Sequence, residues 1–291
     1  MTTTTDPYHS RDVDRWSFGP REDPVVWGQH QGPLSADEVA SFERDGFLIQ
    51  RALFSPEEVS GLLAAAHATA AEDHGEARIL EPDSEAVRSV FRVHRASETF
   101  AALAADERLA GVARQLLADD VYVHQSRINF KPGFQGRAFS WHSDFETWHI
   151  EDGMPRMRAV SAAIALTDNV PVNGPLLLVP GSHRRYVRCV GETPDEHYKQ
   201  SLRDQRYGVP DDEALSQLIA DGGVTQALGP PGTVVFFDCN TMHGSAGNPT
   251  PYPRHNVFFV FNSVDNALVA PFGGRSPRPD FIAERDPLPI A

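Results

Sequence analysis

The sequence predicts a mainly β protein whose core is a β-sandwich or jelly roll flanked by N-terminal α-helices. Helical patterns occupy the first part of the chain, and short strand-like segments follow from residue 121 onward. Clusters of Gly, Pro and Asn separate these segments. Helices followed by many short strands are typical of a β-sandwich or jelly roll with flanking helices. No linker divides the chain, so we expect a single domain over residues 1–291.

The helical part of the chain is expected to follow an extended N-terminal arm. Residues 1–33 are rich in Pro, Asp, Arg and Gly, which predicts an extended N-terminal arm rather than a helix. Ser35 and Ser55 each precede a Glu by three residues, which is the capping-box signature of a helix start. A third segment repeats apolar residues along one side of a helix. We therefore expect helices over about 36–44, 56–72 and 107–117.

The strand part consists of five β-rich segments. They cover residues 121–131, 157–166, 176–179, 233–237 and 256–264. Between them, residues 195–222 are polar and interrupted by Pro and Gly, which predicts a helical insertion or lid. The tail from Arg275 is rich in proline, and we expect it to wrap the surface.

Composition and charge exclude several classes of protein. The net charge of -14 disfavours binding to a phosphate backbone, which needs clustered Lys and Arg. No apolar run approaches the length that crosses a membrane, and the first residues contain no apolar signal segment. Cys189 and Cys239 make neither a disulfide framework nor a thiolate metal cluster. We expect a cytoplasmic protein with no nucleic-acid or membrane partner.

A metal site is suggested by the His-x-Asp motif of His142 and Asp144. Side chains at i and i+2 of a strand point to the same face, so both residues could reach one metal ion. His243, which follows the segment 233–237, is the best candidate for a second histidine. Two His and one carboxylate form the facial triad of non-heme Fe(II) oxygenases. The motif alone is a weak signal, because short motifs recur by chance and many of the 12 histidines are expected at the surface.

Arg254 strengthens the prediction of a 2-oxo acid site. It lies shortly after His243 and opens the strand segment 256–264, and we expect a hairpin to bring that strand back beside His243. A guanidinium binds a carboxylate through two parallel hydrogen bonds, as the far end of 2-oxoglutarate requires. Ser245 lies between them and could donate a hydroxyl hydrogen bond. The alternative is an ordinary surface Arg that closes a loop.

The segment 121–131 carries its polar residues on one face. Its odd positions include Gln125, Arg127, Asn129 and Lys131. An alternating strand usually turns such a face to water. The other interpretation is that this face lines a pocket for charged ligands, with Lys131 neutralising a carboxylate. The segment leads directly to His142, which favours the pocket.

One further histidine follows a buried-strand pattern. Residues 173–183 contain a Leu/Val run that ends in a Pro-Gly-Ser-His turn. A histidine in such a turn is more often a cap or a hydrogen-bond partner than a ligand. We therefore do not expect His183 to replace His243 as the third ligand.

Several longer stretches resemble known enzymes. They are Gln125–Lys131, Phe139–His149, Glu151–Met157, Ala165–Asn169 and Val179–His183, together with the opening segments 6–11, 21–25 and 32–35. On these residues the chain resembles the ectoine hydroxylases, which belong to the phytanoyl-CoA-hydroxylase-like family of Fe(II)/2-oxoglutarate dioxygenases. The resemblance covers nearly the whole chain, and the long motif around His142 is far more specific than His-x-Asp alone.

The resemblance implies a cytoplasmic enzyme, commonly a homodimer, that is mainly β, with a double-stranded β-helix core (the cupin-like jelly roll) flanked by N-terminal α-helices. It would hydroxylate ectoine to 5-hydroxyectoine while 2-oxoglutarate and O2 give succinate and CO2. It implies that Fe(II) is bound by His142, Asp144 and His243. The residues expected to bind 2-oxoglutarate are Asn129, Lys131, Ser245 and Arg254, and those expected to bind ectoine are Gln125, Thr147, Trp148 and Phe261.

The expected substrate fits these side chains chemically. Ectoine is a cyclic amidinium carboxylate, so the aromatic face of Trp148 would attract its delocalised cation. Gln125 can both donate to and accept from a polar ring edge. Two positions depart from the family: His9 stands where Pro is expected, and Ala163 stands where some members have Ser, which leaves one substrate contact unassigned.

Other functions stay open at this point. A related dioxygenase could hydroxylate another small zwitterionic or amino-acid-like compound. A zinc hydrolase could use the same three ligands, but it would need a general base and would have no use for Arg254. The third alternative is a non-catalytic jelly-roll binding protein.

Overall fold

Two antiparallel sheets face each other in the computed structural model, which describes residues 6–82 and 84–290. The larger sheet contains, in spatial order, β2 (Phe47–Gln50), β11 (Val234–Asp238), β7 (Ala159–Ala165), β13 (Arg254–Ser263), β5 (Val121–Lys131), β4 (Val87–Phe91) and β3 (Arg78–Leu80). The smaller sheet contains β10 (Thr225–Gln226), β8 (Leu177–Leu178), β12 (His243–Ser245) and β6 (Phe139–His142). The predicted jelly-roll fold class with flanking N-terminal helices is confirmed.

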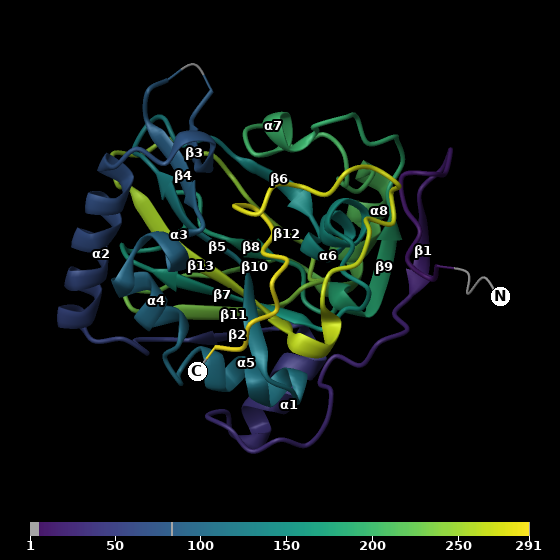
Figure 1. Ribbon diagram of the computed structural model, residues 1–291, viewed down its shortest axis with the longest axis horizontal. Helices are drawn as coiled ribbons and strands as arrows, with labels where there is room; N and C mark the ends of the chain where they lie inside the picture. Colours follow the sequence, from purple (N-terminus) through teal and green to yellow (C-terminus); the bar gives the residue numbers. More distant parts are fainter. Residues whose placement is uncertain (1–5, 83, 291) are drawn as a thin grey trace.

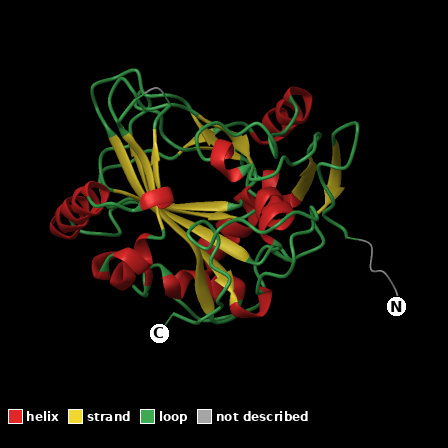
Figure 2. Ribbon diagram, turned by 45° about the horizontal axis from the view of Figure 1, so that its top comes forward, coloured by secondary structure: helices red, strands yellow, loops and turns green. Residues whose placement is uncertain are grey.

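The longer helices cover the outer face of the larger sheet. They are α1 (Ala36–Asp45), α2 (Pro56–Ala71), α4 (Glu98–Ala104) and α5 (Ala110–Leu117), with the short α3 (Val93–Ala96) beside them. Figure 1 shows them along the left and lower sides of the molecule, and Figure 2 shows the strands converging between helices. Both predicted capping boxes are present, at Ser35 and Ser55. The structure adds α4, which the sequence patterns did not predict.

Strand β13 shows how both faces of the larger sheet become buried. Val257, Phe259 and Phe261 pack into the main core with the helices. Phe258 and Val260, between them, belong to separate apolar clusters on the opposite face. A strand buried on both faces reads as a nearly continuous apolar run, which explains the sequence of this segment.

The two ends of the chain pack against the same core. Residues 6–33 contain no helix, and β1 (Ser17–Pro20) pairs with β9 (Arg185–Arg188); residues 1–5 of the expected arm lie outside the described residues. The tail from Arg275 crosses the molecule near α6 (Asp144–Thr147) in Figure 1. None of the helices in the described part of the chain is long and apolar enough to cross a membrane.

Residues 195–222 stand between β9 and β10. They contain a short helix, α7 (Tyr198–Ser201), and a longer one, α8 (Asp212–Gly222). Ala214 and Leu218 of α8 are buried in an apolar cluster with Val179 and Met242. The second half of the segment is therefore anchored to the protein, whereas the first half lies over the cavity described below.

Candidate metal centre and active site

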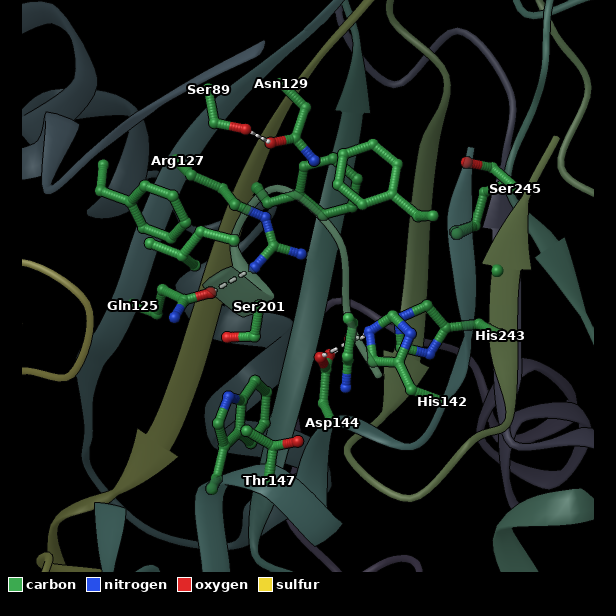
Figure 3. Close-up of a pocket in the computed structure, with 18 of the residues that line it drawn as sticks. Ser89, Gln125, Arg127, Asn129, His142, Asp144, Thr147, Ser201, His243 and Ser245 are labelled. Carbon is green, nitrogen blue, oxygen red and sulfur yellow. Dashed lines mark hydrogen bonds and ion pairs between the residues drawn. The ribbon is translucent and has the colours of Figure 1, made fainter. Parts of the chain in front are cut away.

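His142, Asp144 and His243 lie together at one side of a cavity between the two sheets. One possible ligand atom from each lies within 4.8 Å of the others. His142 Nε2 is 3.5 Å from Asp144 Oδ1, and His243 Nε2 is 3.8 Å from Asp144 Oδ2. Figure 3 shows both imidazole rings facing the same carboxylate. The structure thus brings together the three residues that the sequence singled out.

The local structure at this motif differs from the prediction. His142 ends β6, but Asp144 begins α6, so the two ligands do not alternate along one strand. The chain turns at Ser143, and the carboxylate approaches from the first turn of a helix. His243 begins β12 and is the register partner of His142 in the smaller sheet. This strand pairing brings the distant histidine to the site.

Hydrogen bonds orient both imidazole rings. His142 Nδ1 lies 2.7 Å from the carbonyl oxygen of Ser140, and His243 Nδ1 lies 2.9 Å from that of Thr241. A ring that donates from Nδ1 keeps its Nε2 lone pair for a metal ion. The buried Oδ2 atom of Asp144 has no hydrogen-bond partner. Three oriented and otherwise unused donor atoms fit an Fe(II) ion with open coordination positions.

Electrostatics favour the ligand forms of these groups. Burial and the neighbouring His142 lower the pKa of His243 to about 4, so its ring is neutral at pH 7. Burial alone would raise the pKa of Asp144, but the two imidazoles and the Arg127 guanidinium outweigh it and lower that pKa. A neutral imidazole and an ionised carboxylate are the forms that bind a metal.

An anion site adjoins the histidines. Arg254 and Ser245 both line the cavity and are buried. Arg254 has no ion pair among the described residues, and its Nε atom is buried without a hydrogen-bond partner. Burial and the nearby Arg88 lower the pKa of Arg254 to about 10. An uncompensated buried guanidinium favours the binding of a carboxylate.

The route by which Arg254 reaches the site corrects a prediction. The expected hairpin between His243 and Arg254 does not form, because β12 belongs to the smaller sheet and β13 to the larger one. The intervening loop crosses between the sheets instead. Arg254 therefore approaches the histidines across the cavity, from β13 beside β5.

Lys131 has a different position from the other expected 2-oxoglutarate residues. Its Nζ donates to Ser245 Oγ at 2.8 Å and to the carbonyl oxygen of Ala246. It lies behind Ser245 rather than on the cavity surface. Asn129 does line the cavity, and its Oδ1 accepts a hydrogen bond from Ser89 Oγ at 2.8 Å. We infer that Lys131 supports the site through Ser245.

The polar face of β5 lines the cavity, as the second interpretation of this strand predicted. Gln125, Arg127 and Asn129 all border it (Figure 3). Gln125 accepts a hydrogen bond from Arg127 and donates from Nε2 to the carbonyl oxygen of Ile282 at 2.8 Å. A residue of the C-terminal tail thus helps to orient this wall. Sequence reasoning noted Arg127 but gave it no role.

Thr147 and Trp148 form another part of the wall, as expected. Both border the cavity, and Trp148 is only 2% exposed. The His124 ring packs edge-on against Trp148, with 5.1 Å between ring centroids. Thr147 Oγ1 accepts a hydrogen bond from Arg11 Nη2 at 3.2 Å. The N-terminal arm therefore contacts the cavity wall directly.

Phe261 is not where the prediction put it. It is fully buried in the main core under the helices and does not border the cavity. Phe258, three residues earlier on the same strand, faces the cavity and packs against the Arg127 guanidinium. Side chains alternate between the two faces of a strand, so positions 258 and 261 point to opposite sides. The alternation of the strand separates these two positions, but it does not show which face of the strand meets the cavity.

Two further groups of side chains border the cavity, and the sequence singled out none of them individually. Arg278, from the C-terminal tail, donates from Nε and Nη2 to the carboxylate of Asp152, at 2.7 Å and 2.6 Å. His197, Ser201, Leu202 and Gln205 come from the expected lid. Both segments are distant in sequence from the metal motif, so only the packing of the chain reveals them.

Known proteins are similar to the chain over nearly its whole length. Residues 42–256 match the family model described as phytanoyl-CoA dioxygenase (PhyH). A protein of Stutzerimonas stutzeri named ectoine dioxygenase is 56% identical over 287 residues, which cover 97% of this chain and 95% of that protein. One of the same name from Sphingopyxis alaskensis is 53% identical over 96% of this chain and 93% of its own length.

Solved structures agree with these relatives. The crystal structure of EctD from S. alaskensis with 2-oxoglutarate and 5-hydroxyectoine is similar with a TM-score of 0.90 and 48% identity, covering 98% of this chain and 97% of that one. The structure of the same protein with bound Fe has a TM-score of 0.88, the same identity and the same coverage. The chain therefore belongs to the phytanoyl-CoA dioxygenase family, and within it to the ectoine dioxygenases.

Proposed function

We propose that this protein is an Fe(II)- and 2-oxoglutarate-dependent dioxygenase that hydroxylates ectoine to 5-hydroxyectoine, with release of succinate and CO2. The observation that carries the proposal is one cavity that joins the His142, Asp144 and His243 group to the unpaired Arg254. Full-length similarity to ectoine dioxygenases supports the choice of substrate. Hydroxylation of ectoine makes a compatible solute, so we assign the enzyme to the response to osmotic stress.

Different residues of the cavity are assigned to Fe(II) and to 2-oxoglutarate. We assign His142, Asp144 and His243 to hold Fe(II) on one face, which leaves positions for 2-oxoglutarate and O2. When bound, these groups supply the oxidation in which 2-oxoglutarate becomes succinate and CO2 and a substrate C–H becomes C–OH. We assign Arg254 and Ser245, with Asn129, to the far carboxylate of 2-oxoglutarate, and Lys131 to holding Ser245.

The other end of the cavity is suited to a zwitterion. Trp148 and Phe258 offer aromatic faces to a delocalised cation. The Arg127 guanidinium offers hydrogen bonds to a carboxylate, and Gln125 holds it in place. The lid and the C-terminal tail cover this end and exclude water from the reacting groups.

The experiment is an assay of succinate and hydroxylated product under air, with and without ectoine. Wild-type protein should form both in equal amounts with ectoine, and Asp144→Ala should form neither. The matched control is Asp168→Ala, which removes an exposed carboxylate in the loop after β7. Turnover that persists in Asp144→Ala would disprove the assignment of the triad.

The same assay tests the alternative substrates. Succinate formation that other small zwitterions stimulate more than ectoine would favour a related hydroxylase. Iron-independent turnover, or none with any candidate, would favour a hydrolase or a binding protein. The buried, unpaired Arg254 favours the 2-oxoglutarate reading over a hydrolase, which has no carboxylate to place there.

Two finer statements are also proposals. We propose that the enzyme is a homodimer. The exposed side chains of Phe134 and Tyr252 are available to such an interface. They lie on two loops that are joined by a hydrogen bond from the Phe134 N–H to the carbonyl oxygen of Thr250. Light scattering of the purified protein measures its mass directly. We propose a cytoplasmic location, with which the buried free thiols of Cys189 and Cys239 agree.

A further inference from the structure

The first half of the insertion forms part of the cavity wall. We call residues 195–208 the lid segment; four of its side chains border the cavity. Its backbone is attached to the protein at two places: Arg88 Nε donates to the carbonyl oxygen of Leu202, and Ser140 Oγ donates to that of Gln205, both at 3.3 Å. These are long single hydrogen bonds, so they hold the segment weakly.

A third attachment is buried and ends on a carboxylate. His197 Nδ1 lies 3.0 Å from Glu151 Oε1, and the two side chains are 2% and 6% exposed. The Lys and Arg ion pairs of the lid segment that the structure describes are much more exposed, for example Lys199–Glu196 at 52% and 63%. Exposed pairs contribute little to stability, whereas a buried hydrogen-bonded pair costs much more to break.

Glu151 is itself fixed from the other side. Arg11 of the N-terminal arm donates from Nη1 to Glu151 Oε1 at 2.6 Å and from Nη2 to Glu146 Oε2 at 2.7 Å. Burial would raise the pKa of Glu151, but His197 and Arg11 outweigh it and lower that pKa to about 2. The carboxylate is therefore ionised and already oriented when the lid segment approaches.

Glu151 also lies beside the cavity wall. It belongs to a π-helical turn, Trp148–Asp152, which directly follows α6. Trp148, at the start of this turn, borders the cavity, as does His197 itself. Wide turns of this kind are rare and are concentrated at functional sites. One buried hydrogen bond, from His197 to Glu151, thus joins the lid segment to the turn that carries an aromatic wall of the site.

We propose that His197 is a positioning residue that latches the lid segment over the bound substrate through its hydrogen bond to Glu151. The identity of that substrate rests on the function proposed above, but the latch itself does not. With the latch formed, the lid segment stays against the Trp148 turn and keeps water out of the cavity. Without it, the segment is held by the two long hydrogen bonds, the exposed Arg275–Asp195 ion pair and the edge-on contact of Tyr198 with Phe281.

The latch predicts a specific pattern of kinetic changes. In His197→Phe the ring can still pack against Tyr207, whose centroid is 5.2 Å away, but it cannot donate to Glu151. We expect the KM for the substrate to rise about tenfold and succinate to form in excess over hydroxylated product. The KM for 2-oxoglutarate should stay within about twofold, because Arg254 and Ser245 are untouched. His197→Asn, whose amide can replace Nδ1, should restore most of the wild-type behaviour.

A second measurement requires no turnover. The lid segment contains three trypsin sites, Lys199, Arg203 and Arg206. We expect limited trypsin digestion of the folded, metal-free full-length protein to cut there about tenfold faster in His197→Phe and in Glu151→Gln than in wild type. Glu196→Gln is the matched control, because it makes the same chemical change at an exposed lid position and should leave the cleavage rate unchanged.

The two measurements separate the latch from the proposed function. If wild type does not hydroxylate ectoine but the lid variants are cut faster, the latch stands and the substrate assignment fails. If wild type hydroxylates ectoine and His197→Phe matches it in cleavage rate, KM and coupling, the latch is wrong. Thermal melting of each variant identifies any that is globally unfolded. If His197→Phe is unfolded, the latch is tested with His197→Asn, whose cleavage rate and coupling should match those of wild type.

Discussion

Lys131 donates a hydrogen bond of 2.8 Å from Nζ to Ser245 Oγ, at the strand that also carries His243. Burial, Arg254 and Arg88 lower the pKa of this lysine to about 6. Arg88 is paired with Glu81, but Arg254 has no ion pair among the residues that the structure describes. This corner of the cavity is thus arranged to receive negative charge, and that arrangement can be tested.

Lys131→Met should change how stability depends on pH. A lysine whose folded pKa is about 6, against 10.5 when unfolded, binds fewer protons in the folded state between these values. Its contribution to the free energy of unfolding therefore becomes less favourable as the pH falls from 10.5 to 6. We expect wild type to gain stability between pH 6.5 and 9 relative to Lys131→Met, as measured by urea unfolding. Parallel pH profiles for the two proteins would contradict the lowered pKa.

Arg254→Met should separate binding from stability. Losing a guanidinium that pairs with a carboxylate costs about 2–5 kcal/mol, so the KM for 2-oxoglutarate should rise by about 30-fold or more. The free protein should not melt at a lower temperature, because the buried charge that disappears has no partner. Differential scanning fluorimetry should also show that 2-oxoglutarate stabilises wild type but not the variant. Arg44→Met, at an exposed position on α1, is the control.

Phe258→Leu and Phe261→Leu should have opposite effects. Phe258 borders the cavity, so its replacement should raise the KM for ectoine several-fold with a small loss of stability. Phe261 is fully buried in the main core, so its replacement should lower the free energy of unfolding by about 1–3 kcal/mol and leave the KM unchanged. Steady-state kinetics and denaturant unfolding measure both. A higher KM in Phe261→Leu alone would restore the original sequence prediction.

Glu151→Gln should make the protein less sensitive to acid. The pKa of Glu151 is lowered to about 2, so its ion pairs stabilise the folded state above pH 4.5 and are lost as the pH falls toward 2. At pH 7 we expect the variant to be less stable by about 3 kcal/mol, because Arg11 and His197 lose a charged partner. The difference should shrink between pH 4.5 and 2.5 in chemical denaturation. Glu196→Gln should show no such convergence.

The sequence predicted the parts of the protein that depend on local patterns. The capping boxes at Ser35 and Ser55 form as expected, because a Ser and a Glu three residues apart satisfy free N–H groups without help from the rest of the chain. The strand 121–131 was predicted to the residue, since its alternation is long and regular. Helix α4 was missed, because it is short and depends on packing against the main core rather than on a local sequence pattern.

The site was predicted unevenly for a related reason. His142, Asp144 and His243 were identified because ligand chemistry limits the residue types, and the long motif around His142 then selected a family. The geometry of the site was not predicted. Asp144 begins a helix instead of continuing a strand, and Arg254 lies on the sheet opposite the one that carries the two histidines. Phe261 was assigned to the substrate by resemblance alone, whereas Phe258 borders the cavity. The alternation along a strand separates its two faces but does not tell which face meets the site.

The sequence by itself determined the fold class, the three candidate ligands and the 2-oxoglutarate chemistry, because hydrophobic periodicity, ligand types and the long motif around His142 can be read without knowing the fold. Only the tertiary structure decided what encloses the site. Arg11, His197 and Arg278 come from the arm, the lid segment and the tail, and all three pair with the carboxylates of residues 146–152. Contacts between such distant segments depend on how the whole chain packs, and no local pattern records them.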